Sequence, residues 1–356
     1  MKQSKEIVTQ SAQLNALQEK INQLETEDQY ARNKELSNKI EEIKKAYKKS
    51  VSVYESLVDL RLISKDTAKL DQAYADSISL LVAENYASGS AKLDQLSLDI
   101  SAENQKTITA NVAAMPASSA PVNNTPPSSG YSRQTVKTDI GDFVVSLVSA
   151  DLGSTKIIVD TASDSDCGNN CPVLPLATYV ARNGAYAGVN GTYFCPASYP
   201  TCAGKTNSFD FLLMNKNKTY FNSANNVYSN NPGVIFGGSY IRFVSAVSQW
   251  GRDTSIDSML SNYPLTVQGG NINFGGNDDP KQGSRGNRSF VANRGNTVYI
   301  GIAFNVTVAE SAHVLKSLGM ENALNLDSGG STALWSGGYK VGPGRDIPNV
   351  ILFVNK

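Results

Sequence analysis

The chain of 356 residues is long enough for two or three domains. Hydrophobic residues make up 40% and charged residues 18%, a composition that allows a sizeable globular core. Basic and acidic residues both number 32, so the net charge is zero and no charge excess indicates nucleic acid or an anionic membrane as a partner. No apolar run approaches the ~20 residues of a membrane helix. Residues 1–10 lack the apolar stretch of a signal peptide, although a leader or an anchor could have been removed.

Residues 1–112 are predicted to be an all-α region. Proline is absent before Pro116 and glycine before Gly89. Apolar residues recur at alternating steps of three and four, with lysine and glutamate between them, which is the narrow seam of a coiled coil. The seam comprises Leu14, Leu17, Ile21 and Leu24 and, after a polar break around Asp28, Leu36, Ile40, Ile43 and Tyr47.

Further helical patterns cover residues 70–82 and 93–100, and Ala87-Ser88-Gly89-Ser90 separates them. We therefore expect two or three long helices, arranged as a hairpin or as an oligomeric coil. A solvated spacer stalk is the plainer interpretation of this region. An element for homo-oligomerisation or for docking to a cell wall is the sharper one.

Residues 113–132 are predicted to be a Pro/Ser-rich linker. From Pro116 to Ser132 the sequence reads PASSAPVNNTPPSSGYS, which has no apolar periodicity. Such a composition is typical of an extended, disordered segment. We therefore place a domain boundary here.

Residues 133–356 are predicted to form an α+β domain with mixed sheets. Short β-like runs at residues 142–150, 154–160, 298–304 and 350–354 alternate with glycine- and asparagine-rich loops. Helical patterns cover residues 174–182 and 308–318, and Gly319 is placed to end the second. Strands and helices follow one another without a regular βαβ order, which favours α+β.

Four cysteines, Cys167, Cys171, Cys195 and Cys202, lie close together in the sequence. Zinc sites favour tightly spaced cysteines on both sides of the metal, and only the first pair has such spacing. The second pair lies among prolines, as expected of a stapled loop. We predict two disulfides and an oxidising compartment, with the pairing left open.

Three stretches join glycine, asparagine and carboxylate residues to the ends of strand-like runs, at residues 187–194, 263–270 and 323–332. In the third, a short apolar run leads into Asp327 and then to two glycines, whose backbone can approach a ligand closely. Backbone N–H groups there, with Ser331 and Thr332, could hold an anionic oxygen. The alternative is a tight turn with Asp327 as a turn residue.

In this order the stretches resemble the phosphodiester glycosidase family, which includes N-acetylglucosamine-1-phosphodiester α-N-acetylglucosaminidase and exopolysaccharide-associated bacterial proteins. The matching sequences are Asn190-Gly191-Thr192-Tyr193-Phe194, Tyr263-Pro264-Leu265-Thr266-Val267, Arg288-Ser289-Phe290, Leu326-Asp327-Ser328-Gly329-Gly330-Ser331 and Arg345-Asp346-Ile347-Pro348-Asn349-Val350. Each match alone is weak, but five in order are specific. The sequence departs from the family at Ser328, where the family has glycine. If that glycine has a left-handed backbone, serine costs ~1–2 kcal/mol of strain; otherwise the side chain narrows specificity.

The resemblance implies a hydrolase that cleaves the glycosidic C–O bond of a sugar-1-phosphodiester. The phosphate leaving group is already acidic, so the reaction chiefly needs a carboxylate as base or nucleophile and cations for the phosphate. We expect Asp327 to be the carboxylate and Arg288 and Arg345 to hold the phosphate, rather than to form ordinary surface ion pairs. The expected substrate-binding residues are Asn190, Gly191, Thr192, Gly329, Gly330, Ser331 and Thr332.

Two other features are interpreted conservatively. His313 is the only histidine, and its helical context favours a surface or half-buried position over a catalytic one. The loop Asn277-Asp278-Asp279-Pro280 has clustered oxygens that suit calcium, but a plain turn is the favoured interpretation. No metal site or cofactor is therefore assigned, with a divalent cation such as calcium left as an alternative.

The sequence therefore predicts a secreted or cell-surface hydrolase carried on a helical stalk. Its expected partners are a glycan or sugar-phosphate substrate and further copies of the chain through the coiled coil, and no nucleic acid is expected. The alternative function is a non-catalytic carbohydrate-binding or surface-adhesion protein with the same fold.

Overall fold

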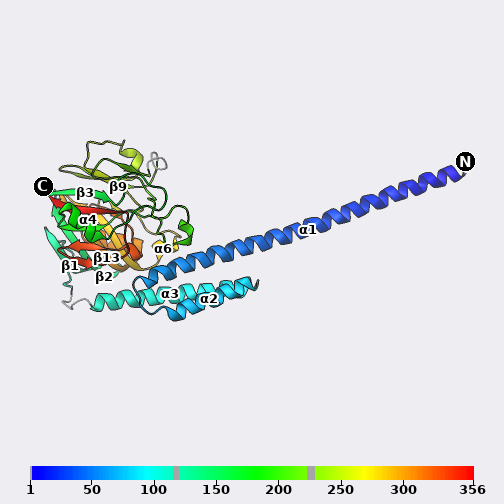
Figure 1. Ribbon diagram of the computed structural model, residues 1–356, viewed down its shortest axis with the longest axis horizontal. Helices are drawn as coiled ribbons and strands as arrows, with labels where there is room; N and C mark the ends of the chain where they lie inside the picture. The colour runs from blue at the N-terminus through cyan, green and yellow to red at the C-terminus, as the bar shows by residue number, and fades with distance from the viewer. Residues whose placement is uncertain (1, 115–119, 223–228) are drawn as a thin grey trace. The chain divides into compact units, whose positions relative to one another are not determined.

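The computed structural model describes residues 2–114, 120–222 and 229–356. Three helices, α1 (Lys2–Arg61), α2 (Ala68–Val82) and α3 (Tyr86–Ala114), precede a region of strands and shorter helices (Figure 1). The chain divides into two compact units, Met1–Tyr54 with Gln72–Leu96, and Glu55–Asp71 with Ser97–Lys356. The second unit thus combines the C-terminal end of α1 and most of α3 with the region of strands.

In the first unit, α1 continues without interruption through the polar break around Asp28, and the predicted seam is exposed along it. The predicted break at residues 87–90 is wrong, because α3 already begins at Tyr86. The break lies instead around Glu84, which has a positive φ of 58°. Gly89 lies in the first turn of α3, where a Cβ would come within 2.5 Å of the Leu81 side chain of α2 and would require that side chain to move.

The strands of the second unit form three antiparallel sheets. The largest has the order β1 (Gly130–Thr138), β2 (Gly141–Asp151), β13 (Thr297–Val306), β12 (Gly286–Arg294), β14 (Asn322–Asn325), β10 (Leu265–Gln268) and β11 (Asn271–Ile272). Figure 1 shows β1, β2 and β13 side by side in this sheet. The four strand runs predicted from the sequence correspond to β2, β13 and two strands of the next sheet.

The other two sheets have five strands each. One has the order β16 (Tyr339–Val341), β15 (Leu334–Ser336), β4 (Ala187–Asn190), β17 (Asn349–Asn355) and β3 (Thr155–Thr161). The other has the order β6 (Tyr220–Phe221), β5 (Leu213–Met214), β9 (Ser258–Ser261), β7 (Gly233–Phe236) and β8 (Ile241–Val244).

A common core lies among the three sheets, and the period of two along each strand explains how it forms. On β13, Val298, Ile300 and Ile302 enter the common core, whereas Tyr299 and Ala303 belong to a cluster on the opposite face. That outer cluster also contains Val314 and Leu315 of α7 (Val308–Ser317). These sheets are therefore covered on both faces, which explains their nearly continuous apolar strands.

The helices of this region begin and end where local chemistry predicts. Helix α7 begins with a capping box between Thr307 and Glu310, and Gly319 follows its end with a φ of 74°. Helix α4 (Leu176–Asn183) packs Leu176, Tyr179 and Val180 against the five-stranded sheet that contains β3 and β17. The short helices are α6 (Pro280–Gly283), η1 (Pro200–Cys202), η2 (Val247–Gln249) and η3 (Gly329–Ser331).

Part of the predicted linker is ordered. Residues 120–125 lie along β1, where Thr135 N donates to Pro121 O at 3.0 Å and the Gln134 side chain donates to Asn123 O at 2.6 Å. Disorder therefore does not extend over these residues, because β1 offers its outer edge to them. Residues 115–119 of the predicted linker lie outside the described residues.

A long N-terminal helical region followed by a domain of antiparallel sheets and helices confirms the predicted α+β class. Coiled-coil assembly and the domain boundaries at residues 112 and 132 stay predictions.

Candidate active site

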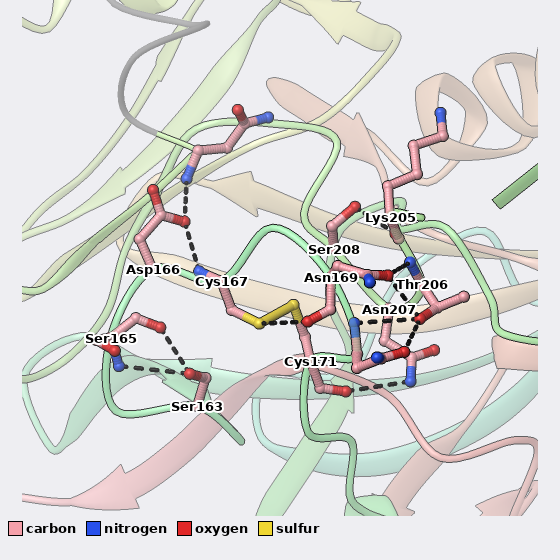
Figure 2. The surroundings of a disulfide bond; sticks show 12 residues. Ser163, Ser165, Asp166, Cys167, Asn169, Cys171, Lys205, Thr206, Asn207 and Ser208 are labelled. Atoms are coloured by element: carbon pink, nitrogen blue, oxygen red, sulfur yellow. Dashed lines mark hydrogen bonds between the residues drawn. A yellow bond between two sulfur atoms is a disulfide. The ribbon is translucent and has the colours of Figure 1, made fainter. Parts of the chain in front are cut away.

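Two disulfides, Cys167–Cys171 and Cys195–Cys202, confirm the predicted oxidation of the four cysteines and settle their pairing. Figure 2 shows the first of them beside the segment from Lys205 to Ser208. Asn207 joins the two disulfide loops, since its side chain donates to Cys171 O at 3.1 Å and accepts from Ala197 N at 3.2 Å. The loop closed by Cys195–Cys202 is thereby fixed at both ends, and it carries Tyr199.

A pocket of about 630 Å³ lies next to this loop, within the second compact unit. On one side it is lined by loops at the ends of strands, and on the other by the end of α1 and by α3. The side chains that the argument uses are Asp59, Tyr193, Tyr199, Asp279, Lys281, Arg288, Asp327 and Arg345. The three residues predicted to carry the chemistry, Asp327, Arg288 and Arg345, therefore line one pocket.

Asp327 directly follows β14 and the buried Leu326. Its backbone N–H donates to Gly191 O at 2.9 Å, which ties it to the end of β4. One carboxylate oxygen accepts from Ser328 N at 2.8 Å. Burial raises the pKa of Asp327 to about 6, although Ser331, Arg345 and Ser328 act in the opposite direction. The carboxylate is therefore held in place and becomes ionised near neutral pH.

Arg345 lies next to the loop that follows Asp327, since its backbone N–H donates to Gly330 O at 2.7 Å, and it contacts two partners from other parts of the chain. Its Nη2 donates to Asp59 Oδ1, and Tyr199 Oη donates to Asp59 Oδ2. The guanidinium also lies over the Tyr199 ring, 5.4 Å from the centroid. Burial lowers the pKa of Arg345, but Asp59, Tyr199 and Asp327 outweigh it, so the pKa is raised. Nε of Arg345 is buried and has no hydrogen-bond partner among the described residues.

Arg288 is 7% exposed, and its guanidinium donates to several neighbouring backbone carbonyl groups. Nε donates to Val306 O at 3.2 Å, and Nη2 donates to Lys281 O at 2.8 Å and to Ser284 O. Burial lowers its pKa, opposed by Tyr193, Asp279 and Asp327. Arg288 thus holds the loop that contains α6 in place and lines the pocket at the same time.

The first motif is divided by the pocket wall: Tyr193 and Phe194 line the pocket, whereas Asn190, Gly191 and Thr192 do not. Asn190 is fully buried, and its amide donates to Asp327 O at 2.6 Å. Its Oδ1 accepts from Ser289 Oγ at 2.8 Å and from Ala333 N at 3.1 Å. These bonds connect the end of β4 to β12 and to the backbone of Asp327, so the asparagine positions the loop that follows Asp327.

Gly191 and Thr192 have a similar structural environment. A Cβ on Gly191 would collide with the side chain of Asn349. That side chain accepts from Thr192 N and donates to Thr192 Oγ1, both at 2.9 Å. The motif therefore needs a glycine for close approach to Asn349, not for contact with a ligand.

The predicted loop from Gly329 to Thr332 divides into two parts. Gly329, Gly330 and Ser331 line the pocket, whereas Thr332 does not and is buried. Ser328 has a φ of −142°, so its backbone is extended and the predicted strain does not arise. Gly329 takes the positive φ, at 63°. The serine at the family's glycine position is therefore compatible with the backbone and faces the pocket.

Of the two other features considered in the sequence, His313 does not line the pocket, whereas Asp279 does. His313 is on α7, and its Nδ1 is 2.7 Å from Asp139 Oδ1. Asp279 acts as the N-cap of α6, where its carboxylate accepts from Lys281 N at 2.9 Å, as in the favoured turn interpretation. Among the described residues, no group of three histidine, cysteine, aspartate or glutamate side chains is placed to hold a metal ion.

Comparison with known proteins gives one family. Residues 183–354 match the family model "Phosphodiester glycosidase". Residues 183–354 form a phosphodiester glycosidase domain. Comparison with curated proteins gave no match.

Among solved structures, the phosphodiester glycosidase domain shares its fold with the catalytic domain of zebrafish N-acetylglucosamine-1-phosphodiester alpha-N-acetylglucosaminidase. The two are 15% identical with a TM-score of 0.50, and the match covers 67% of this chain and 87% of the zebrafish domain. A hypothetical protein from Synechocystis is 14% identical with a TM-score of 0.46, over 64% of this chain. The chain spans 62% of the length of the Synechocystis protein.

Several pocket residues were not predicted from the sequence. Tyr193 lies inside a quoted motif, and its Oη accepts from Asn325 Nδ2 at 2.7 Å. Burial raises its pKa, so the phenol stays neutral. Asp279 was considered only for calcium. Asp59 and Tyr199 carried no signal, because they lie outside the motifs and meet Arg345 only in the folded chain.

Proposed function

We propose that the pocket hydrolyses the glycosidic C–O bond of a sugar-1-phosphodiester. The observation that supports this most directly is Asp327, a carboxylate with a pKa of about 6 that is held at a strand end and lines the same pocket as Arg345. The phosphodiester glycosidase domain supplies the type of reaction. The glycan that carries the phosphodiester is not specified by these residues.

Asp327 acts as the carboxylate at the anomeric carbon, either as base towards water or as nucleophile. Its raised pKa makes it a stronger base than an ordinary aspartate, while it is still mostly ionised at neutral pH. Gly329, Gly330 and Ser331 line the pocket after it, and the backbone N–H groups of the two glycines suit oxygen atoms of the ligand. Ser331 instead hydrogen-bonds to Asp327 through its side chain and to Ser328 O through its N–H, at 3.3 Å. Asn190 and Asn349 act one layer behind as positioning residues.

Arg345 is the principal holder of the phosphate, because its guanidinium lines the pocket and its Nε has no partner among the described residues. Arg288 contributes charge at the pocket while it holds the α6 loop. Lys281 adds a further cation, whose Nζ pairs with Glu55 at 3.3 Å and lies 4.5 Å from the Tyr199 ring centroid.

We propose that the enzyme acts outside the cytoplasm, secreted or at the cell surface. Two disulfides persist in an oxidising compartment, which supports this location. Among the described residues, no helix is both long and apolar enough to cross a membrane. Detection of both disulfides in protein isolated from its native compartment would test the location; reduced thiols there would contradict it.

We also propose that α1 assembles copies of the chain into a parallel coiled coil. The exposed fractions of Leu14 and Ile21 in the seam are 72% and 46%, which is costly for a lone helix. In a parallel pair, Lys20 would meet Glu25 and Glu27 would meet Arg32 beside the seam. Sedimentation equilibrium should show an oligomer that Ile21→Lys weakens; a monomer at every concentration would contradict the proposal.

Replacing Asp327 with asparagine tests the catalytic assignment. The substitution keeps the shape and removes the charge, so turnover of a panel of sugar-1-phosphodiesters should fall about 10²–10⁴-fold. Asp142→Asn, an exposed change on β2, is the matched control and should keep full activity. Thermal melting of both variants monitors the fold.

Full activity of Asp327→Asn with a normal melting curve would refute the role of this carboxylate. If the unmutated chain cleaves no member of the panel but binds glycans, the alternative of a non-catalytic carbohydrate-binding protein replaces the hydrolase.

A further inference from the structure

The charged side chains that line the pocket balance one another. The acidic ones are Asp59, Asp210, Asp279 and Asp327, and the basic ones are Lys281, Arg285, Arg288 and Arg345. A site meant only to attract phosphate would have an excess of basic residues. The acidic residues other than Asp327 therefore need an explanation, and Asp59 is the one in direct contact with the phosphate-holding arginine.

Asp59 comes from the last turns of α1, far from the motifs in sequence. Both of its carboxylate oxygens are used at the pocket, one on Arg345 Nη2 and the other on Tyr199 Oη. Its side chain is 31% exposed, and that of Arg345 is 12% exposed. The ion pair is thus partly shielded from water, so the Asp59 charge acts on anything bound at Arg345.

Close packing around the end of α1 keeps the Asp59 side chain at the pocket. A Cβ on Gly329 would lie 4.0 Å from Asp59 Oδ2, and a Cβ on Gly330 would collide with Leu62 and Arg345. The end of α1 therefore packs directly on the loop that follows Asp327. Any ligand phosphate at Arg345 shares this guanidinium with a carboxylate.

Hydrolysis increases the negative charge of the phosphate, and the Asp59 carboxylate repels the additional charge. The bond from the anomeric carbon to the phosphoester oxygen breaks, and a bond from that carbon to a water oxygen forms. The phosphate leaves as a monoester, and the proton lost by water passes to the base or to solvent. A phosphodiester carries one negative charge, whereas a phosphomonoester carries about 1.5 to 2 at neutral pH.

We propose that Asp59 is a specificity-determining residue that makes the pocket accept a singly charged phosphodiester and reject a doubly charged phosphomonoester. The extra charge of the monoester meets the carboxylate on Arg345 and is repelled. The same repulsion expels the phosphomonoester product after cleavage. This inference rests on the proposed function for the identity of the phosphate site, and it names the ligand charge that the site selects.

The test is binding of two small probes to the full chain at pH 7.5, measured by calorimetry. Phenyl phosphate carries two charges and methyl phenyl phosphate carries one. Asp59→Asn should improve the affinity for phenyl phosphate relative to methyl phenyl phosphate by about tenfold or more, because unit charges this close interact strongly at a partly buried site.

Two variants provide the controls. Asp59→Glu retains the charge and should retain the preference for the diester. Asp71 lies in the same unit, pairs with Arg61 at 2.7 Å and does not line the pocket. Asp71→Asn should therefore leave the ratio of the two affinities unchanged. A phenyl phosphate competition assay during turnover should show tighter product-type inhibition for Asp59→Asn.

An unchanged ratio in Asp59→Asn would overturn the proposal, as would an equal loss of affinity for both probes, which indicates a purely structural role. Absence of binding in every variant would overturn it as well. Because the probes have no glycosidic bond, the ratio can change even if no sugar-1-phosphodiester is cleaved. Failure of this proposal and failure of the proposed hydrolysis are therefore distinguishable.

Discussion

The two sides of the pocket are built in different ways. On the strand side, Asp327 follows β14, and buried asparagines connect its backbone to β4 and β12 through several hydrogen bonds. On the helical side, Asp59 and its neighbours reach the pocket through a few side-chain contacts. Among the residues that the structure describes, the hydrophobic core clusters of the sheets contain no residue of α1 or α3.

We relate this difference in construction to two functions, the positioning of Asp327 and the selection of the ligand. The proposed role of Asp327 at the anomeric carbon requires a fixed position, and the sheets provide it through hydrogen bonds to the backbone of this residue. The helical side is not required by the sheet core and can vary without unfolding it. We therefore expect changes on the strand side to alter stability and turnover together, and changes on the helical side to alter selectivity.

The largest effect on stability is expected on the strand side, for Asn190→Ala. Asn190 is fully buried and makes three side-chain hydrogen bonds, to Asp327 O, Ser289 Oγ and Ala333 N. Its removal leaves those groups without partners, which should cost about 2–4 kcal/mol of unfolding free energy and most of the turnover.

Denaturant unfolding of Asn190→Ala, with the exposed Asn271→Ala on β11 as control, measures this cost. The control should change stability by less than about 0.5 kcal/mol. Equal stability of the two variants would mean that the asparagine does not position the catalytic loop.

The glycines of the catalytic loop test the contact between the two sides. Alanine at Gly330 would collide with Arg345 and Leu62, so affinity for the substrate should fall at least about tenfold. Alanine at Gly329 meets only Asp59 at 4.0 Å, and its cost of about 1 kcal/mol comes from the positive φ of 63°. Similar KM values for the two variants would contradict the contact.

Removal of the helical side gives a smaller effect on folding. A fragment of residues 120–356 keeps every hydrophobic core cluster and the segment that pairs with β1. It should unfold cooperatively and remain monomeric, but without Asp59 it should lose the preference for methyl phenyl phosphate over phenyl phosphate. A fragment that aggregates, or that keeps the preference, would show that the two sides are not separable in this way.

The sequence predicted the strand side better than the helical side, for physical reasons. Short apolar runs between loops rich in glycine and asparagine identified β2, β3, β13 and β17, and the run before Asp327 identified a strand end. The motifs identified Asp327, Arg288 and Arg345, and all three line one pocket. Local pattern could not separate residues that contact a ligand from residues that position others, so Asn190 and Thr192 were expected in the pocket and lie behind it.

Asp59 could not be found from the sequence at all. It stands in a helical pattern between Leu57 and Leu60, where an acidic residue normally faces solvent. Its proposed role depends on contacts with Arg345 and Tyr199, which are 286 and 140 positions away in the sequence. The pairing of the cysteines depended on the folded structure for the same reason.

The smallest expected effect is a shift in the pH dependence of turnover. Removing Asp59 and removing Arg345 should shift it in opposite directions. Turnover requires ionised Asp327, so it should rise with pH through an apparent pKa of about 6. Asp59 raises the pKa of Asp327, and Arg345 lowers it. Asp59→Asn should therefore move the acidic limb to lower pH, and Arg345→Gln should move it to higher pH, each by less than about one unit.

Stability gives an independent measurement of the same group. The pKa of Asp327 in the folded chain lies above its ordinary value of 3.8, so ionisation opposes folding. The free energy of unfolding should therefore be unaffected by this group below about pH 4 and fall as the pH rises towards about 6, and Asp327→Asn should remove that decrease. Melting curves between these pH values, compared with the Asp142→Asn control, would show this decrease.

The turnover measurements have their own contradicting outcome. A pH profile of turnover that moves in the same direction for Asp59→Asn and Arg345→Gln would contradict the opposing influence of these two residues on Asp327.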